Sequence, residues 1–225
     1  MILNDISMSF VVVIASYLIG SVPSALLIGK FVADIDLRIH GTGNLGASNL
    51  SSQVNAIWAI PVIIFDIFAK GYLPVLIASE YILGLGISTE IAAGLAGITG
   101  HNWSIFSRFK GGRGMATMVG ATLALNFPLL IAYGIVPALG VLFTPWKDSA
   151  VWWFIAILIL PLWAILLNLP IELLIFSIIF ILVTSIKRIT SNSLHNKHGA
   201  TSASLFATRL VFDRDIANRE KWIRQ

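Results

Sequence analysis

Five long apolar stretches dominate the sequence, at approximately residues 9–29, 54–79, 81–100, 115–143 and 150–186. About 20 apolar residues form a helix that crosses a bilayer, so each of the first three stretches has the length of one helix. The last two are too long for one straight span, and Pro128, Pro161 and Pro170 interrupt their backbone hydrogen bonding. The pattern predicts an all-α, polytopic transmembrane helical bundle of about seven helical segments that make five or seven crossings.

The composition supports a membrane protein, because 57% of the 225 residues are hydrophobic and only 12% are charged. A soluble domain carries about a quarter charged residues, with which it covers its surface. Lipid must therefore cover much of the exterior. Only Asp5 is charged before the first long apolar run, so we expect a retained helix rather than a cleaved signal peptide. The absence of cysteine excludes disulfides and thiolate metal sites.

The positive charges fall in three clusters. Thirteen of the fifteen lysines and arginines lie within residues 30–38, 108–113 and 187–224. Basic residues gather in the cytoplasmic loops of membrane proteins, so this distribution reports topology rather than nucleic-acid binding. It predicts an N-terminus outside, a cytoplasmic C-terminus and an odd number of crossings.

We expect residues 1–187 to form a transmembrane catalytic domain with cytoplasmic loops at 30–53 and 101–114. Residues 188–225 form a basic cytoplasmic tail. Its apolar residues Leu205, Phe212, Ile216 and Ile223 recur near helical spacing between basic residues. This pattern favours either an amphipathic helix on the membrane surface or a partly ordered, solvated tail.

The loop after the first helix combines glycines with polar groups suited to an anion. Gly41 and Gly43 permit tight turns and expose backbone N–H groups. Arg38 precedes them with a planar fork that matches phosphate, and Asn44 and Asn49 follow. The simpler alternative is a flexible connection.

A second such loop ends in Lys110-Gly-Gly-Arg-Gly114, directly before an apolar helix. Free N–H groups, the positive end of a helix and flanking cations together favour an anion. The alternative role of these cations is anchoring on the cytoplasmic side. Two such loops on one face are typical of a site that surrounds a phosphate ligand.

Six further polar residues, in the apolar stretches or in the loops that follow them, are candidates for chemistry or for structural pairing. Ser21 and Ser24 flank Pro23, and such serines either pack within a membrane helix or line a site. Asp66 and Lys70 are four residues apart, which favours a structural ion pair over substrate contact. His40 and His101 are candidates for acid–base groups or for hydrogen-bond donors to phosphate.

Several of these motifs together resemble the bacterial acyl-phosphate-dependent glycerol-3-phosphate acyltransferases. The resemblance rests on Gly20-Ser-Val-Pro-Ser24, Asp36-Leu-Arg38 with the glycine loop to Asn49, Asp66 to Gly71, Gly100-His101, and Phe109-Lys-Gly-Gly-Arg-Gly-Met-Ala-Thr117. It covers most of the first half of the chain, in the family's order and spacing. The second half matches only in length and hydropathy.

The resemblance implies a small multi-pass enzyme of the bacterial cytoplasmic (inner) membrane whose active site faces the cytoplasm. Such enzymes transfer a fatty acyl group from acyl phosphate to the sn-1 hydroxyl of glycerol 3-phosphate, giving lysophosphatidate and phosphate in the first step of phospholipid synthesis. The implied partners are these two substrates and membrane lipid, with no metal, cofactor or nucleic acid.

On this basis the expected catalytic residues are Arg38, Lys110 and His101. The two cations would hold phosphate and stabilise developing charge. The base is either His101 or a phosphate oxygen of a substrate. The expected substrate-binding residues are Ser21, Ser24, Gly41, Gly43, Asn44, Asn49, Gly111, Gly112, Arg113, Gly114, Arg188 and Asn192.

The chain departs from the family pattern at several positions. Arg113 replaces a lysine, Ser104 a proline and Ser52 an arginine. The third motif keeps Arg188 and Asn192, but no His-x-x-Asn occurs in the sequence. This loss favours a second hypothesis, a non-catalytic relative that binds acyl phosphate or lipid. The third hypothesis, an organic-phosphate transporter, lacks the paired repeats common in such proteins.

Overall fold

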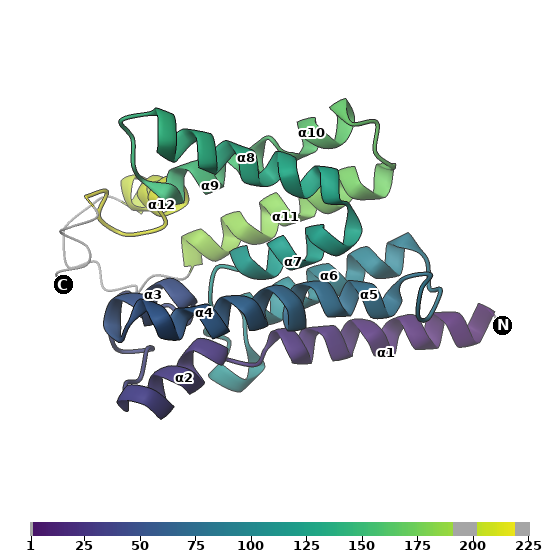
Figure 1. Cartoon of the computed structure of the whole chain (residues 1–225), viewed down its shortest axis with the longest axis horizontal. Coiled ribbons are helices and arrows are strands. Elements are labelled where there is room, and N and C mark those ends of the chain that lie inside the picture. The colour runs from purple at the N-terminus through teal and green to yellow at the C-terminus, as the bar shows by residue number, and fades with distance from the viewer. Residues whose placement is uncertain (1, 191–201, 219–225) are drawn as a thin grey trace. The chain divides into compact units, whose positions relative to one another are not determined.

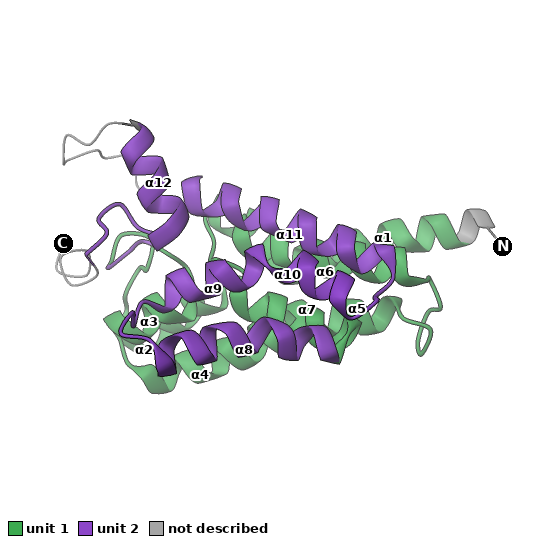
Figure 2. Ribbon diagram, turned by 90° about the horizontal axis from the view of Figure 1, so that it is seen from above, with its two compact units in different colours: residues 1–40, 44–127 green, residues 41–43, 128–225 purple. Residues whose placement is uncertain are grey.

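The computed structural model describes residues 2–190 and 202–218, and all regular structure in these ranges is helical (Figure 1). The chain forms two compact units, shown in Figure 2. The first comprises residues 1–40 and 44–127, and the second residues 41–43 and 128–225. The expectation of an all-helical protein is confirmed.

The first unit is built from α-helices, a π-helix and a 3-10 turn. The π-helix η1 (Asp66–Tyr72) continues α4 and leads into α5, and together they run from Ala56 to Ala78. The other helices are α1 (Ile2–Gly20), α2 (Ser24–Ala33), α3 (Ala47–Gln53), α4 (Ala56–Phe65), α5 (Leu73–Ala78), α6 (Ile87–Asn102), the 3-10 turn η2 (Ile105–Ser107) and α7 (Met115–Leu125).

The second unit consists of α8 (Phe127–Phe143), α9 (Ser149–Leu158), α10 (Leu160–Leu166), α11 (Ile171–Thr190) and α12 (Ser202–Phe212). Arginines tie its C-terminal segment in place. Arg209 pairs with Asp215 at 2.7 Å, and Arg214 pairs with Asp148. Both arginines are buried, so the described part of the basic tail packs within its unit.

The predicted breaks in the long apolar stretches are confirmed at Asn126, next to Pro161 and at Pro170. The first stretch, expected as a single helix, is divided into α1 and α2 because residues 21–23 interrupt it before the proline-capped start at Ser24. The helix expected over the third stretch, residues 81–100, begins only at Ile87. The described residues hold twelve α-helices, more than the roughly seven expected from the length of the apolar stretches.

Three helical segments in the described residues are long and apolar enough to cross a membrane: Asp5–Ala33, Ala56–Ala78 and Ile171–Thr190. The pair α9 and α10, bent by 44°, makes a fourth if it counts as one span. Large apolar side chains such as Phe10 and Phe31 are exposed, as lipid-facing residues are. The number of crossings and the side of each terminus stay predictions.

Glycines allow the helices of the first unit to touch backbone to backbone. A Cβ added to Gly20 would lie 2.2 Å from the carbonyl oxygen of Gly97, and one added to Gly97 would lie 2.2 Å from that of Lys70. A Cβ added to Gly71 would lie 2.1 Å from the carbonyl oxygen of Thr117. Small residues are the usual means by which membrane helices approach closely. These contacts fix η1 between its neighbours.

We expect Gly97→Ala to destabilise the protein by about 1–3 kcal/mol, because a backbone cannot yield as a flexible side chain can. The matched control is Gly134→Ala in α8, where no atom lies within 4 Å of the added Cβ. That control should be neutral or stabilising by up to about 1 kcal/mol, since alanine is the better helix former. Thermal unfolding in mild detergent measures both, and equal effects would contradict the proposed close contact.

Candidate active site

Four buried polar side chains meet inside the first unit. Lys70 Nζ lies 2.7 Å from Asp66 Oδ1, 3.2 Å from Ser24 Oγ and 3.3 Å from His101 Nδ1. The Ser24 hydroxyl donates to Asp66 Oδ1 at 2.9 Å. The predicted Asp66–Lys70 ion pair is therefore confirmed, and the cluster extends it to the start of α2 and the end of α6.

The ion pair is almost entirely enclosed, since both side chains are 2% exposed. Removing two charges from water is costly, and only close pairing with further hydrogen bonds compensates. The serine and the histidine supply such bonds. Both charges stand in η1, at its first residue and four residues later.

The second loop folds over the end of α6. The Gly112 N–H donates to the carbonyl oxygen of His101 at 3.0 Å. A Cβ added to Gly112 would lie 2.1 Å from His101 Nε2, and one added to Gly111 would lie 2.2 Å from the His101 carbonyl oxygen. Glycine is thus required by close approach to the histidine. The Gly112 N–H is thus engaged by the His101 carbonyl, and the expected role of Gly112 in holding phosphate stays a prediction.

The first loop is held by an ion pair at its start. Arg38 contacts Asp36 through Nε at 2.9 Å and through NH2 at 2.5 Å. Hydrogen bonds from Arg38 hold the pKa of the Asp36 carboxyl well below its ordinary value, and the same bonds raise the pKa of Arg38. Asp36 therefore stays ionised and orients the guanidinium throughout the neutral range.

Asn49 fixes the course of the same loop from inside. Its Nδ2 donates to the carbonyl oxygens of His40 at 3.1 Å and Asn44 at 2.9 Å. Leu45 N–H donates to the carbonyl oxygen of Gly111 at 3.4 Å, which joins the first loop to the second. This amide organises the loop backbone, and the expected substrate-binding role of Asn49 stays a prediction.

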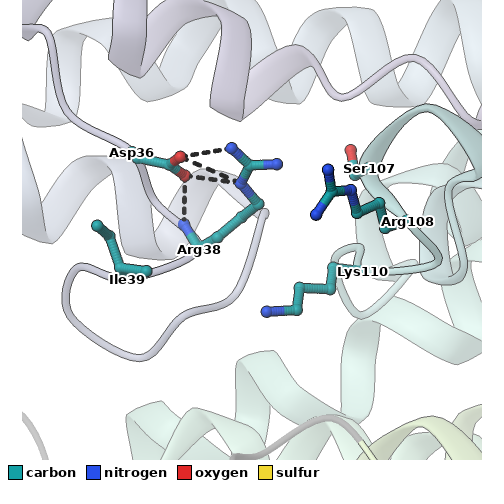
Figure 3. A pocket seen from close by; sticks show the side chains of 6 residues that line it. All are labelled: Asp36, Arg38, Ile39, Ser107, Arg108 and Lys110. Atoms are coloured by element: carbon teal, nitrogen blue, oxygen red, sulfur yellow. Dashed lines mark hydrogen bonds and ion pairs between the residues drawn. The ribbon is translucent and has the colours of Figure 1, made fainter.

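An open pocket of about 260 Å³ lies between the two loops. Figure 3 shows Arg38 and Asp36 on one side of it, and Arg108 and Lys110 on the other. Ile39 and Ser107 complete the lining. Three cationic side chains against one carboxylate, which is itself paired, leave an excess of positive charge. The pocket therefore suits an anionic group such as a phosphate.

Comparison with known proteins identifies the architecture. The family model for glycerol-3-phosphate acyltransferase matches residues 10–195. The chain belongs to the glycerol-3-phosphate acyltransferase family. It is thus an integral membrane acyltransferase, and phospholipid synthesis follows from the family.

Individual relatives agree with this assignment. Glycerol-3-phosphate acyltransferase 5 of Dehalococcoides mccartyi (strain ATCC BAA-2266 / KCTC 15142 / 195) is 35% identical over 96% of this chain and 94% of its own length. Glycerol-3-phosphate acyltransferase 2 of Moorella thermoacetica is 44% identical, over 50% of this chain and 56% of its own. The crystal structure of PlsY (YgiH), an integral membrane glycerol 3-phosphate acyltransferase, in its glycerol 3-phosphate form, matches with a TM-score of 0.72 and 26% identity, covering 80% of this chain and 88% of PlsY.

The site residues expected from the sequence lie in different parts of the structure. Arg38 and Lys110 meet at the pocket, as the two-loop hypothesis predicts. His101 and Ser24 lie in the buried cluster instead. Ser21 is fully buried, and its hydroxyl has no hydrogen-bond partner among the described residues. The turn residues Gly41, Gly43 and Gly114 have positive φ, Asn44 and Arg113 are half-buried, and Gly111 is buried.

Two expected residues come from the third motif. The Arg188 guanidinium donates to the carbonyl oxygens of Ala150, Leu210 and Val211 at 2.9 to 3.2 Å and lies over the Phe154 ring. These carbonyls within the second unit engage the guanidinium, and the expected substrate contact of Arg188 stays a prediction. Asn192 lies outside the described residues.

Two residues that line the pocket, Asp36 and Arg108, are absent from the site residues expected from the sequence. Asp36 was seen only as part of a motif and Arg108 only as a basic residue of a cluster, yet both line the pocket. The position of Asp36, two residues before Arg38, was the available sequence signal for the Asp36–Arg38 ion pair.

Ser104, which replaces a family proline, donates its hydroxyl to the carbonyl oxygen of Ser21.

The buried pair predicts strongly non-additive stability effects. Lys70→Met or Asp66→Leu alone should each destabilise the acyltransferase by about 3–5 kcal/mol, because the remaining charge is buried without its counterion. The double variant should be more stable than either single variant. Thermal unfolding of all four proteins in the same detergent measures the coupling, and additive losses would contradict it.

Proposed function

We propose that this acyltransferase takes its acyl group from acyl phosphate and transfers it to the sn-1 hydroxyl of glycerol 3-phosphate. The products are lysophosphatidate and inorganic phosphate. The single observation that carries the proposal is the cationic pocket between the two glycine-rich loops, since donor, acceptor and both products are phosphates. The reported PlsY structures, in glycerol 3-phosphate and lysophosphatidic acid forms, support the acceptor and the product.

The surroundings of the pocket suit a substrate with a charged head and an apolar tail. Ile105, Phe106 and Phe109 are exposed beside Arg108 and Lys110 in the same loop. Apolar side chains next to cations are typical of a segment at the membrane interface. This arrangement supports an acyl chain in the lipid phase and a phosphate among the cations.

The proposed reaction is a direct transfer without an acyl-enzyme. The glycerol hydroxyl oxygen bonds to the acyl carbon, and the bond from that carbon to the phosphate oxygen breaks. The hydroxyl proton leaves to a base, and the electron pair of the broken bond stays on inorganic phosphate. Arg38 and Lys110 bind phosphate and stabilise the charge that develops on it. Bringing both substrates to one pocket supplies the proximity that the transfer requires.

In this proposal the site faces the cytoplasm at the bacterial inner membrane, and the basic loops support that orientation. Lys110 and its neighbours Arg108 and Arg113 lie in one loop, and Lys30 and Arg38 flank the end of α2. Such an excess of lysine and arginine is the mark of cytoplasmic loops.

The second candidate is a relative that binds acyl phosphate without turning it over. The observation that favours it is the altered third motif, in which Ile189 stands at the position of the family's histidine. A relative of this kind keeps the cationic pocket but does not catalyse acyl transfer.

The deciding experiment mixes protein in mild detergent with palmitoyl phosphate and glycerol 3-phosphate, and follows released phosphate and lysophosphatidate. Equal amounts of both products, formed only with acceptor present, are expected. Phosphate release without lysophosphatidate would point to hydrolysis or another acceptor. Binding without any product, in protein shown to be folded, would favour the non-catalytic relative.

Lys110→Ala should lower turnover by about 10²–10³-fold, because it removes a charge aimed at the developing phosphate. Lys147→Ala is the matched control, since this lysine belongs to the second unit and donates to the carbonyl oxygen of Val141. The control should leave turnover unchanged. Steady-state rates measure both, and an active Lys110→Ala enzyme would remove Lys110 from the mechanism.

A further inference from the structure

We propose that the His101 ring is neutral and protonated at Nε2, and that Lys70 and Asp66 are positioning residues that fix the ring in this form against Gly112. The inference deepens the proposed function, on which it rests, by assigning roles to groups that lie behind the pocket. It gives His101 a positioning role in place of the two roles considered from the sequence, an acid–base group and a hydrogen-bond donor to phosphate.

The hydrogen bonds of Lys70 determine which ring nitrogen carries the proton. A charged lysine has three N–H donors and no acceptor. Its three neighbours within hydrogen-bond distance are Asp66 Oδ1, Ser24 Oγ and His101 Nδ1, at 2.7, 3.2 and 3.3 Å. Each donor therefore has one acceptor. Nδ1 must offer a lone pair to take its place in this set, so the ring proton lies on Nε2.

The charges around the ring keep it neutral. Asp66 is the carboxylate of the cluster, and it already pairs with Lys70 at 2.7 Å. His101 Nδ1 lies farther away, at 3.6 Å from Asp66 Oδ2. A protonated imidazole would place a second cation beside the lysine on one carboxylate. Because the cluster is buried, that arrangement is costly, whereas a neutral ring completes it.

The other edge of the ring faces the loop that contains Lys110 and Gly112. His101 Nε2 would lie 2.1 Å from a Cβ on Gly112, so the ring packs against the face where that glycine lacks a side chain. The Gly112 N–H donates to the carbonyl oxygen of the same histidine. His101 thus holds the turn through both its ring and its backbone, immediately after Lys110.

A ring in this state is not suited to accept the proton of the glycerol hydroxyl. Nδ1 receives a hydrogen from Lys70, and Nε2 already carries one. The chain Asp66, Lys70, His101, Gly112 instead transmits a fixed geometry from η1 to the loop that presents Lys110. Its role resembles that of the outer groups that orient the ligands of a metal site.

Two substitutions separate the positioning role from a base. In His101→Gln the amide NH₂ reaches the place of Nε2 and preserves the contact with Gly112. In His101→Asn the shorter side chain reaches only the place of Nδ1 and preserves the acceptor for Lys70. We expect the glutamine variant to keep turnover within about tenfold of the parent and the asparagine variant to lose about 100-fold.

A base would give a different result, because neither amide accepts a proton. Both variants would then lose about 10²–10⁴-fold. Equal, large losses in folded proteins would overturn the proposal. The matched pair differs only in the position of one amide, so general damage to the fold is detected by comparing their thermal unfolding.

The tautomer itself is measured by ¹⁵N NMR of full-length protein labelled at histidine. The His101 signals are those absent from His101→Gln. A neutral ring protonated at Nε2 at neutral pH supports the proposal, and an Nδ1-protonated ring or an imidazolium overturns it. Because this readout needs no turnover, protein inactive with palmitoyl phosphate but carrying the expected tautomer would refute the proposed function alone.

Discussion

Contact between backbones, made possible by glycine, is the constraint on which the first unit depends. Gly20, Gly97 and Gly71 each lie so close to a neighbouring carbonyl oxygen that a methyl group would overlap it. Through these contacts α1, α6, η1 and α7 form a rigid group in which side chains contribute little to the spacing. Because hydrophobic driving forces between helices are weak in lipid, such close packing is a principal source of association. A site built on this group inherits its precision.

The electrostatic organisation follows from that packing and has two levels. The buried level is the cluster of Asp66, Lys70, Ser24 and His101, where each hydrogen bond is made within the protein. The exposed level is the pocket, where Arg38 and Lys110 face solvent. Gly112 joins the two levels, because it touches the histidine below and belongs to the loop above. The charges that we propose to bind substrate are accessible, while the charges of the buried cluster are shielded from solvent.

The sequence predicts those features that local chemistry determines. Proline and asparagine mark the breaks at Asn126 and Pro170, and the spacing of Asp66 and Lys70 indicates their pairing. Tertiary packing decides the rest. The π-helix has no signature in the order of its residues, and the acceptor of the Gly112 N–H is known only once α6 ends beside it. Arg188 likewise has carbonyl partners that lie far from it in sequence.

The ion pair in η1 also has a consequence for biosynthesis. The candidate span Ala56–Ala78 carries an aspartate and a lysine, each of which opposes insertion into a bilayer by about 2.5–3.5 kcal/mol at the centre of a helix. Both charges lie in the same segment, four residues apart, so they neutralise one another as soon as it coils. Insertion by the translocon therefore need not wait for α6 to be synthesised. Had the two charges stood on different spans, each would have crossed the lipid alone.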